Sequence, residues 1–360
     1  MGPTGVWSGR PPVSTKRGTF VAKAEYVIRR LLLAVLVLVG VSIITFVIAR
    51  LVPSDPVSLY VGPRAKPETR EAARIKLGLD RPLYEQYLRY MGEVLRGDFG
   101  ISVRSRRPIV DDLKVFLPAT LELVFVSMIF TVLIGIPLGV LSAAFKDGWL
   151  DHFSRVFAVV NVSMPVFWLA LLMQLLFVRQ LVLLPIGGRV SREIAILAPI
   201  DKITGFYLVD TALAGNWAAF RDVSSHLILP SIALATYGIG LSIRMTRATM
   251  VEVLQQKYIT AAWAAGLTRR TVYLRLALKN AIVPTLMVLS LNFVWQISGA
   301  MLVEIVFLWP GLGTYLVNAI LTIDFPIVVS VALVVTVFYV LSNLFVDVLQ
   351  AMIDPRVTLE

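Results

Sequence analysis

Few residues of this chain have the type and spacing that acid–base or metal chemistry requires. The chain has 360 residues, no cysteine and only two histidines, His152 and His226, which lie far apart. A disulfide framework and a Cys-based metal site are therefore excluded, and a metal site or relay built on histidine has little material. No carboxylate pair or nucleophile–base constellation falls in register within the apolar segments. The sequence predicts no catalytic, metal or cofactor-binding residues.

Phosphate chemistry is not predicted within this chain either. It contains no G-x-x-x-x-G-K-[ST] loop, and no glycine is followed by lysine anywhere in the sequence. Because such a loop wraps the phosphates of a nucleotide, any use of ATP is expected to depend on another chain.

Two amides lie within an apolar run. Asn292 and Gln296 are four residues apart, so they share one face of a helix, with Trp295 and Ser298 nearby. An unpaired amide is costly in hydrocarbon, so this face is expected to meet protein or water. A pathway lining and a hydrogen bond between helices both fit this spacing, and the second is favoured.

Three carboxylates also stand near apolar runs. Glu122 is expected in the first turn of a span, where it favours the positive helix end and reaches water, which predicts a structural placement. Glu304 and Asp324 bracket the hairpin-like turn Trp309-Pro310-Gly311, for which a solvated loop is one interpretation.

The elements that carry these residues belong in a membrane. The chain is 57% hydrophobic and 16% charged, with a mean hydropathy of +0.79. A net charge of +11 is also typical of nucleic-acid-binding proteins, but no basic stripe interleaved with aromatic residues accompanies the charge, so a partner nucleic acid is not expected.

Six apolar runs are near the length of a membrane-spanning helix, at about 31–49, 118–144, 156–180, 227–243, 281–303 and 327–349. The first is too long for the apolar region of a secretory signal peptide, and the run 227–243, which contains Pro230, Gly238 and Gly240, is the weakest.

The connections between the runs predict an orientation. Residues 244–280 carry seven Lys and Arg against one acid, whereas 304–326 contain no Lys or Arg, which places both termini in the cytoplasm of a cell-membrane protein. Residues 1–26 are expected to form a flexible cytoplasmic tail ahead of a membrane domain at 27–353. Two long connections, 51–117 and 181–226, then lie outside. The first contains an amphipathic helix around 83–95, expected on the outer membrane face, and the second is expected to be irregular and able to contact an external partner.

The local structure of a short segment in the basic connection 244–280 can be predicted from its residues. The alanine-rich run from Tyr258 favours a short helix, Gly266 suits a left-handed residue just past its end, and Thr268 suits the N-cap of the next helix. Such a helix with small side chains can sit in a groove on a partner, although an ordinary connection fits the spacing equally well.

This segment resembles the EAA loop of binding-protein-dependent ABC importer permeases. The resemblance rests on Thr260-Ala261-Ala262 with Gly266 four residues on, followed by Asn280-Ala281-Ile282-Val283-Pro284. Thr260 replaces the usual glutamate, a departure common in peptide-type permeases. Further stretches resemble the B-type subunits of dipeptide and oligopeptide permeases and, with the loop, cover most of residues 27–356: Gly97-Asp98-Phe99-Gly100, Leu117-Pro118-Ala119-Thr120-Leu121-Glu122-Leu123, His226-Leu227-Ile228-Leu229-Pro230, and Glu304-Ile305-Val306-Phe307-Leu308-Trp309-Pro310-Gly311-Leu312-Gly313.

The resemblance implies an all-α membrane protein with the fold of a type I ABC importer transmembrane domain: six transmembrane helices, a cytoplasmic coupling helix and two long extracytoplasmic loops. It implies a permease without enzymatic activity whose partners are a second homologous permease, two ATPase subunits that bind ATP and Mg, and an extracytoplasmic solute-binding protein. The expected solute is a peptide or oligosaccharide. The resemblance also supports a re-entrant external gate at Glu304, Trp309, Pro310 and Gly311. ATPase coupling is expected at Tyr258, Thr260, Ala261, Ala262, Gly266 and Leu267.

Two other classes of function compete with this one. An ion-coupled transporter or channel usually shows intramembrane ionisable residues or paired broken helices, and these runs show little of either. An intramembrane enzyme would need a catalytic constellation, which the runs lack. The identity of the solute is not readable from this chain.

Overall fold

Helices make up nearly all of the regular structure, as the apolar runs predict. A computed structural model describes residues 16–51, 56–62, 64–76 and 78–353. Within these ranges there is no β-strand, and one isolated antiparallel bridge joins Ile101 to Pro108. The elements are α1 (Lys16–Leu51), α2 (Pro56–Val61), α3 (Pro67–Lys76), α4 (Leu83–Val94), α5 (Ile109–Ala144), α6 (Trp149–Ser163), α7 (Val166–Met173), η1 (Gln174–Gln180), α8 (Arg192–Leu197), α9 (Tyr207–Leu213), α10 (Trp217–Leu254), α11 (Lys257–Ala264), η2 (Thr271–Ala277), α12 (Leu278–Val306), α13 (Leu312–Leu321) and α14 (Phe325–Ile353), where η1 and η2 are π-helical.

Several of these helices are long and apolar enough to cross a bilayer. Among the described residues there are five such segments: Leu31–Ile48, Ile109–Ala144, Trp217–Leu254, Thr271–Val306 and Phe325–Val346. A sixth span is formed if the bent pair of α6 with α7 and η1 counts as one. The all-helical, multi-pass fold class predicted from the sequence is therefore confirmed.

The run predicted as one span at 156–180 is broken in the structure. Its two halves, Trp149–Ser163 and Val166–Gln180, meet at an angle of 109°. Met164 between them has an extended backbone, with φ −84° and ψ 133°, and Pro165 follows it. Proline has no N–H to continue the helix and disfavours helical geometry in the residue before it, which accounts for the break.

The run predicted as the weakest span lies within the longest helix. α10 has 38 residues and packs against α5, α6 and α12. Its glycines permit this packing, because a Cβ at Gly240 would overlap the carbonyl of Ala158 on α6. On the opposing helix α5, added Cβ atoms at Gly135 and Gly139 would overlap Ser242 and Thr246 of α10. The small residues that weaken the helix in isolation are thus the ones that let its neighbours approach.

The segment before the first span differs from the sequence prediction. α1 begins at Lys16, so the second part of the predicted flexible tail 1–26 is helical, and residues 1–15 lie outside the described residues.

The predicted amphipathic helix is present as α4, and it packs on α1. The hydroxyl groups of Tyr87 and Ser42 lie 2.7 Å apart, and the rings of Tyr87 and Tyr90 pack against Phe46. Part of its apolar stripe therefore meets protein, while Leu83, Tyr84 and Leu88 remain exposed. Its position on the outer membrane face stays a prediction.

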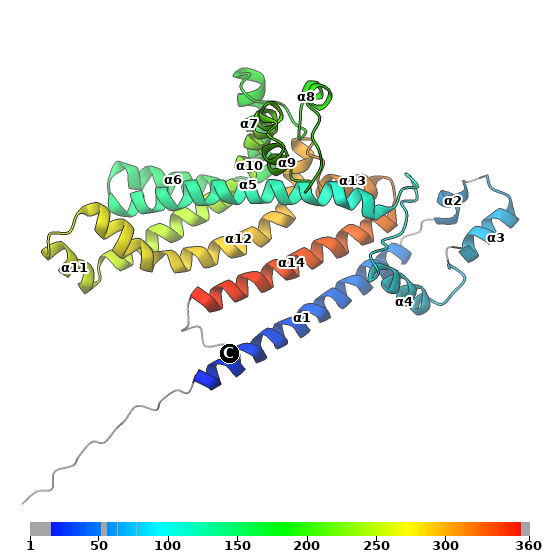
Figure 1. Ribbon diagram of the computed structural model, residues 1–360, viewed down its shortest axis with the longest axis horizontal. Coiled ribbons are helices and arrows are strands. Elements are labelled where there is room, and N and C mark those ends of the chain that lie inside the picture. Colours follow the sequence, from blue (N-terminus) through cyan, green and yellow to red (C-terminus); the bar gives the residue numbers. More distant parts are fainter. Residues whose placement is uncertain (1–15, 52–55, 63, 77, 354–360) are drawn as a thin grey trace, which may run out of the picture.

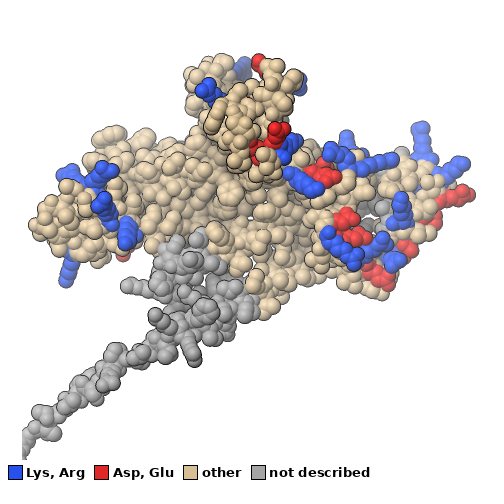
Figure 2. Space-filling model, in the orientation of Figure 1, with Lys and Arg blue, Asp and Glu red and all other residues tan. Residues whose placement is uncertain are grey.

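The two ends of the bundle differ in character. α11 lies at one end of the long axis, and α13 with α2–α4 lies at the other (Figure 1). On the face shown in Figure 2, Lys and Arg gather near α11, both signs of charge mix over α2–α4, and the band between them is largely uncharged. This distribution suits a protein whose middle lies in hydrocarbon.

Candidate functional site

The short helix α11 ends in the geometry predicted for Gly266. Gly266 has φ +75°, its N–H donates to Trp263 O at 3.0 Å, and the N–H of Leu267 donates to Ala262 O at 3.2 Å. This pair of bonds is a Schellman motif, which satisfies carbonyls left free at the helix end. A left-handed residue is required at Gly266, and glycine adopts that conformation without steric cost.

The next helix starts at Thr268, also as predicted. Its Oγ1 accepts from Thr271 N at 3.4 Å and lies 3.0 Å from Thr271 Oγ1, while Val272 N donates to the carbonyl of Thr268 at 3.0 Å. Together Gly266 and Thr268 fix the turn between α11 and the helical segment that leads into α12.

One face of α11 is built into the chain. Ile259 and Ala262 are buried in a cluster whose other buried members come from α5, α10, η2 and α12: Val140, Ala143, Met250, Val272, Ala277 and Ala281. The Tyr258 hydroxyl accepts from Asn280 Nδ2 at 2.8 Å, which ties the start of α11 to α12. α11 is therefore seated on the ends of several long helices rather than suspended in a loop.

The opposite face of α11 is free. Tyr258, Thr260, Ala261, Gly266 and Leu267, all predicted to couple to a partner, are exposed. Ala262, predicted with them, is instead 8% exposed and faces the cluster, because it lies three residues after Ile259 on the same side of the helix. Ala262 therefore helps to seat α11 on the bundle, and its part in ATPase coupling stays a prediction.

A polar contact that sequence reasoning missed lies close to α11. Asp151, near the start of α6, has no exposed surface and accepts two hydrogen bonds from the guanidinium group of Arg247 on α10, from Nε at 2.6 Å and from Nη2 at 2.8 Å. The residues are 96 positions apart, so no local periodicity pairs them. The sequence signal that could have indicated this contact was Asp151 itself, an acidic residue at the edge of an apolar run.

The two amides of α12 lie between helices. Asn292 and Gln296 are 3% and 4% exposed, and Gln296 Nε2 donates to Thr131 Oγ1 of α5 at 3.4 Å. Asn292 lies against Gly238 of α10, where an added Cβ would overlap its Nδ2. These contacts favour interhelical packing, and a pathway lining at Asn292 and Gln296 stays a prediction.

The turn after α12 is largely buried, although Leu308 is exposed, and this contradicts its interpretation as a solvated loop. Glu304 and Trp309 have no exposed surface. The Trp309 Nε1–H donates to Ala119 O at 2.9 Å, and the Thr120 hydroxyl donates to Glu304 Oε1 while accepting from Leu312 N at 2.8 Å. The turn is thereby fixed to the first third of α5. The gate role of Glu304, Trp309, Pro310 and Gly311 stays a prediction.

Glu122 was expected to reach water from the first turn of a span, but in the structure it does not. α5 begins at Ile109, which places Glu122 more than three turns into the helix, where it is 2% exposed. It accepts from Arg189 Nη2 at 2.5 Å and from Leu208 N at 2.7 Å. The Arg189 guanidinium also stacks 3.6 Å over the ring of Tyr207. Arg189 was missed because it lies in a connection predicted to be irregular.

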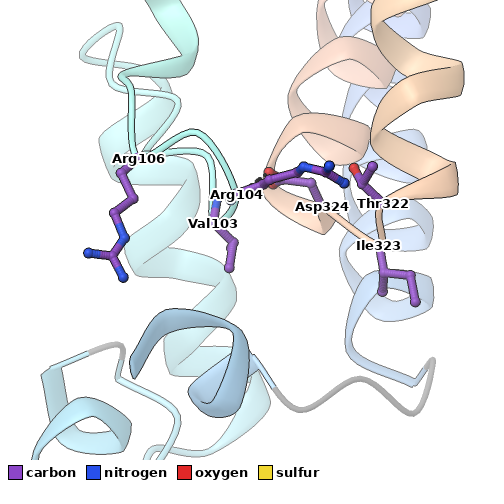
Figure 3. Close-up of a pocket in the computed structure, with 6 residues that line it drawn as sticks. All are labelled: Val103, Arg104, Arg106, Thr322, Ile323 and Asp324. Carbon is purple, nitrogen blue, oxygen red and sulfur yellow. Dashed lines mark hydrogen bonds between the residues drawn. The ribbon is translucent and has the colours of Figure 1, made fainter. Parts of the chain in front are cut away.

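Asp324 fastens the loop before α5 to the junction of α13 and α14. Its carboxylate accepts from Ser102 Oγ at 2.6 Å and from the backbone N–H groups of Val103 and Arg104 at 3.3 and 3.1 Å. Figure 3 shows the loop and the junction facing one another across a pocket, with Arg104 and Asp324 side by side.

Beside this pocket, the Tyr315 hydroxyl donates to Asp112 at 3.0 Å. Burial, together with this hydrogen bond, raises the pKa of Tyr315. A tyrosine is protonated at neutral pH in any case, and the raised pKa extends the range over which the Tyr315 hydroxyl remains a donor to alkaline pH.

The described residues do not group into a metal site. No cluster of three or more His, Asp or Glu that could hold a metal ion occurs among them.

Replacing Gly311 by alanine is expected to lower the melting temperature of the detergent-solubilised protein. A Cβ at Gly311 would overlap the Glu304 carboxylate, which hydrogen bonds hold in place. Overpacking of this kind costs about 1–3 kcal/mol. Gly299→Ala is the matched control, because its Cβ would meet only Leu234 Cδ1 at 3.9 Å. Equal melting temperatures for the two variants would show that the turn is not packed as described.

Comparisons with known proteins match almost the whole chain. Residues 135–359 match the family model of the binding-protein-dependent transport system inner membrane component, and residues 23–124 match the N-terminal model of such components. The probable D,D-dipeptide transport system permease protein of Escherichia coli K12 is 45% identical over 90% of this chain and 94% of its own length. A dipeptide transport system permease protein of Alkalihalophilus pseudofirmus is 41% identical over 92% of this chain and 98% of its own.

A more distant relative and one solved structure extend these matches. The glutathione transport system permease protein of an Escherichia coli O1:K1 strain is 34% identical over 92% of this chain and 98% of its own. A chain of the inward-facing MetNI methionine ABC transporter aligns at 16% identity with a TM-score of 0.46, covering 66% of this chain and 93% of that one.

Proposed function

This chain belongs to the family of binding-protein-dependent transport system inner membrane components, and from that premise we propose that it is the permease subunit of an ATP-driven importer of short peptides. It is a multi-pass membrane permease by family and by its apolar helices. The proposal goes beyond this in three respects: the solute is a peptide, the chain has partner subunits, and it has a defined orientation in the membrane.

The coupling to ATP hydrolysis takes place at α11. A partner ATPase docks on the exposed face formed by Tyr258, Thr260, Ala261 and Leu267. The support for this proposal is geometric: α11 is short, capped at its C-terminus, exposed on one side, and seated on the other side upon the ends of α5, α10 and α12. A helix seated in this way transmits a displacement to the long helices, because packed interiors move as units rather than compress. A second homologous permease, two ATPases that bind ATP and Mg, and an external solute-binding protein complete the assembly.

The single observation that carries the solute class is the set of relatives. Permeases named for dipeptide transport share 37–45% identity with this chain over at least nine-tenths of its length. A glutathione permease at 34% also handles a peptide, which widens the proposal from dipeptides to short peptides.

A competition experiment tests the solute. The tagged chain is purified from its source membranes with its partners, reconstituted in liposomes, and supplied with the solute-binding protein and a radiolabelled dipeptide. Di- and tripeptides are expected to compete for ATP-driven uptake, whereas a maltose-type oligosaccharide is not. Uptake of a radiolabelled oligosaccharide supplied in place of the dipeptide, with no competition by peptides, would overturn the peptide assignment while leaving the permease role intact.

The proposed orientation places both termini and α11 in the cytoplasm. Because the chain has no cysteine, a thiol reagent labels only the single cysteine that is introduced. A cysteine at exposed Lys202 is expected to react with an impermeant thiol reagent added to intact cells, and one at exposed Thr268 only after the membrane is opened. Labelling of Thr268→Cys alone in intact cells would invert the orientation.

A further inference from the structure

The pair formed by Asp151 and Arg247 joins three elements at the α11 end of the bundle. Besides the two bonds from Arg247, the Asp151 carboxylate accepts from Ser142 Oγ, near the end of α5, at 2.6 Å, and from Asp147 N in the α5–α6 turn at 3.0 Å. All four donors therefore converge on one carboxylate, which lies wholly inside the protein, while the Arg247 side chain is 21% exposed. Charge-assisted bonds with this forked geometry are directional and stronger than neutral ones.

Arg247 stands on the part of α10 that leads into α11. α10 ends at Leu254 and α11 begins at Lys257, so only Gln255 and Gln256 separate the two helices. One turn before the end of α10, Thr249 Oγ1 donates to Ala281 O of α12 at 2.9 Å. The end of α10 is thus bonded on one side to α12 and on the other, through Arg247, to the α5–α6 turn.

The α5–α6 turn has few other polar ties to α10. The close approach of Gly139 to Thr246 is steric and non-directional, so it resists compression but not sliding. The turn itself is irregular, with Phe145 outside helical geometry and Asp147 at φ +61°. Packing lets α5 and α10 move together, and a directional tie adds to it a fixed register between α10 and this turn.

We propose that Asp151 and Arg247 are positioning residues for transport: they form a clamp that makes the α5–α6 turn, and with it the bent pair of α6 and α7, follow a displacement of α11. The inference rests on the proposed function, because it needs α11 to receive movement from an ATPase. Burying a charge pair is costly and gains little stability over an apolar contact, so its advantage here is fixed geometry between two helices. In Asp151→Asn or Arg247→Met the ATPase still binds and hydrolyses ATP, but the movement is not passed on.

The test measures solute transported per ATP hydrolysed, in liposomes that contain the whole complex. Asp151→Asn and Arg247→Met are expected to reduce this ratio about tenfold, within the usual range of coupling between sites, with ATPase co-purification unchanged. Arg247→Lys keeps the charge but loses the fork, and its ratio is expected to fall between those of Arg247→Met and the parent. It also serves as the test if the stronger variants do not assemble.

Arg155→Met is the matched control. Arg155 Nε also lies 3.8 Å from the Asp151 carboxylate, but it stands on α6 itself, so removing it takes away a neighbouring charge without untying α10. Its ratio is expected to stay at the parental value. Parental ratios in Asp151→Asn and Arg247→Met, or an equal loss in Arg155→Met, would overturn the clamp. Absence of ATP-driven uptake in the parent complex would instead refute the proposed function.

Discussion

Replacing Gly266 by valine is expected to abolish most ATP-driven uptake while the chain still inserts in the membrane. No heavy atom lies within 4 Å of the position that a Cβ would occupy, so the effect is not a clash but arises from the backbone, at φ +75°. A β-branched residue held there costs about 1–3 kcal/mol. If that strain opens the Schellman motif, the occupancy of the docking geometry falls by roughly tenfold for each 1.4 kcal/mol. Uptake in vesicles and co-purification of the ATPase are the two measurements.

Two companion variants separate the backbone effect from the docking surface. Gly266→Asn is expected to retain most of the uptake, because asparagine tolerates the left-handed conformation. Ala261→Asp leaves the motif intact but places a charge on the exposed face, and it is expected to weaken ATPase binding. If Gly266→Val and Ala261→Asp both transport at the parental rate, α11 is an ordinary connection.

Breaking the buried pair between Glu122 and Arg189 is expected to give the largest loss of folding stability among the variants proposed for this chain. Both side chains are no more than 3% exposed, so either single replacement leaves an uncompensated charge inside the protein. Such a loss typically amounts to about 3–5 kcal/mol. We expect Glu122→Leu and Arg189→Met to lower the melting temperature sharply in detergent, as followed by size-exclusion of heated samples.

The double variant shows how the loss arises. Glu122→Leu with Arg189→Met removes both charges, so it is expected to be more stable than either single variant. It should still fall short of the parent, because Leu208 N and Gly205 O lose their partners. Strictly additive losses in the double variant would mean that the two side chains do not interact.

Local signals in the sequence predicted the long apolar helices and the turn that ends α11. Apolar run length predicted the all-helical membrane fold, and the placement of glycine and threonine predicted the turn at Gly266 and Thr268. The same local rules underestimated α10, because Gly238 and Gly240 reduce helix propensity in isolation but permit close packing with Asn292 and Ala158. The break at Met164 had a local signal in Pro165 that was not used.

Contacts between residues far apart in the chain could not be predicted from the sequence. Asp151 finds Arg247, and Glu122 finds Arg189, only after the helices have packed, and neither spacing follows a helical period. For the same reason the turn at Trp309 could not be placed against Ala119 in advance. Run length and capping describe each helix separately, whereas these pairs depend on where one helix lies against another.

ATP dependence of peptide uptake tests the central claim most directly. The chain, its partner permease and the ATPases are reconstituted in liposomes with the solute-binding protein and a labelled dipeptide. Uptake is measured with MgATP, with a non-hydrolysable ATP analogue, and with an imposed proton or sodium gradient in the absence of ATP. We expect uptake only with MgATP and only when the ATPases are present. Gradient-driven uptake by this chain without the ATPases would contradict the account and assign the chain to secondary transport.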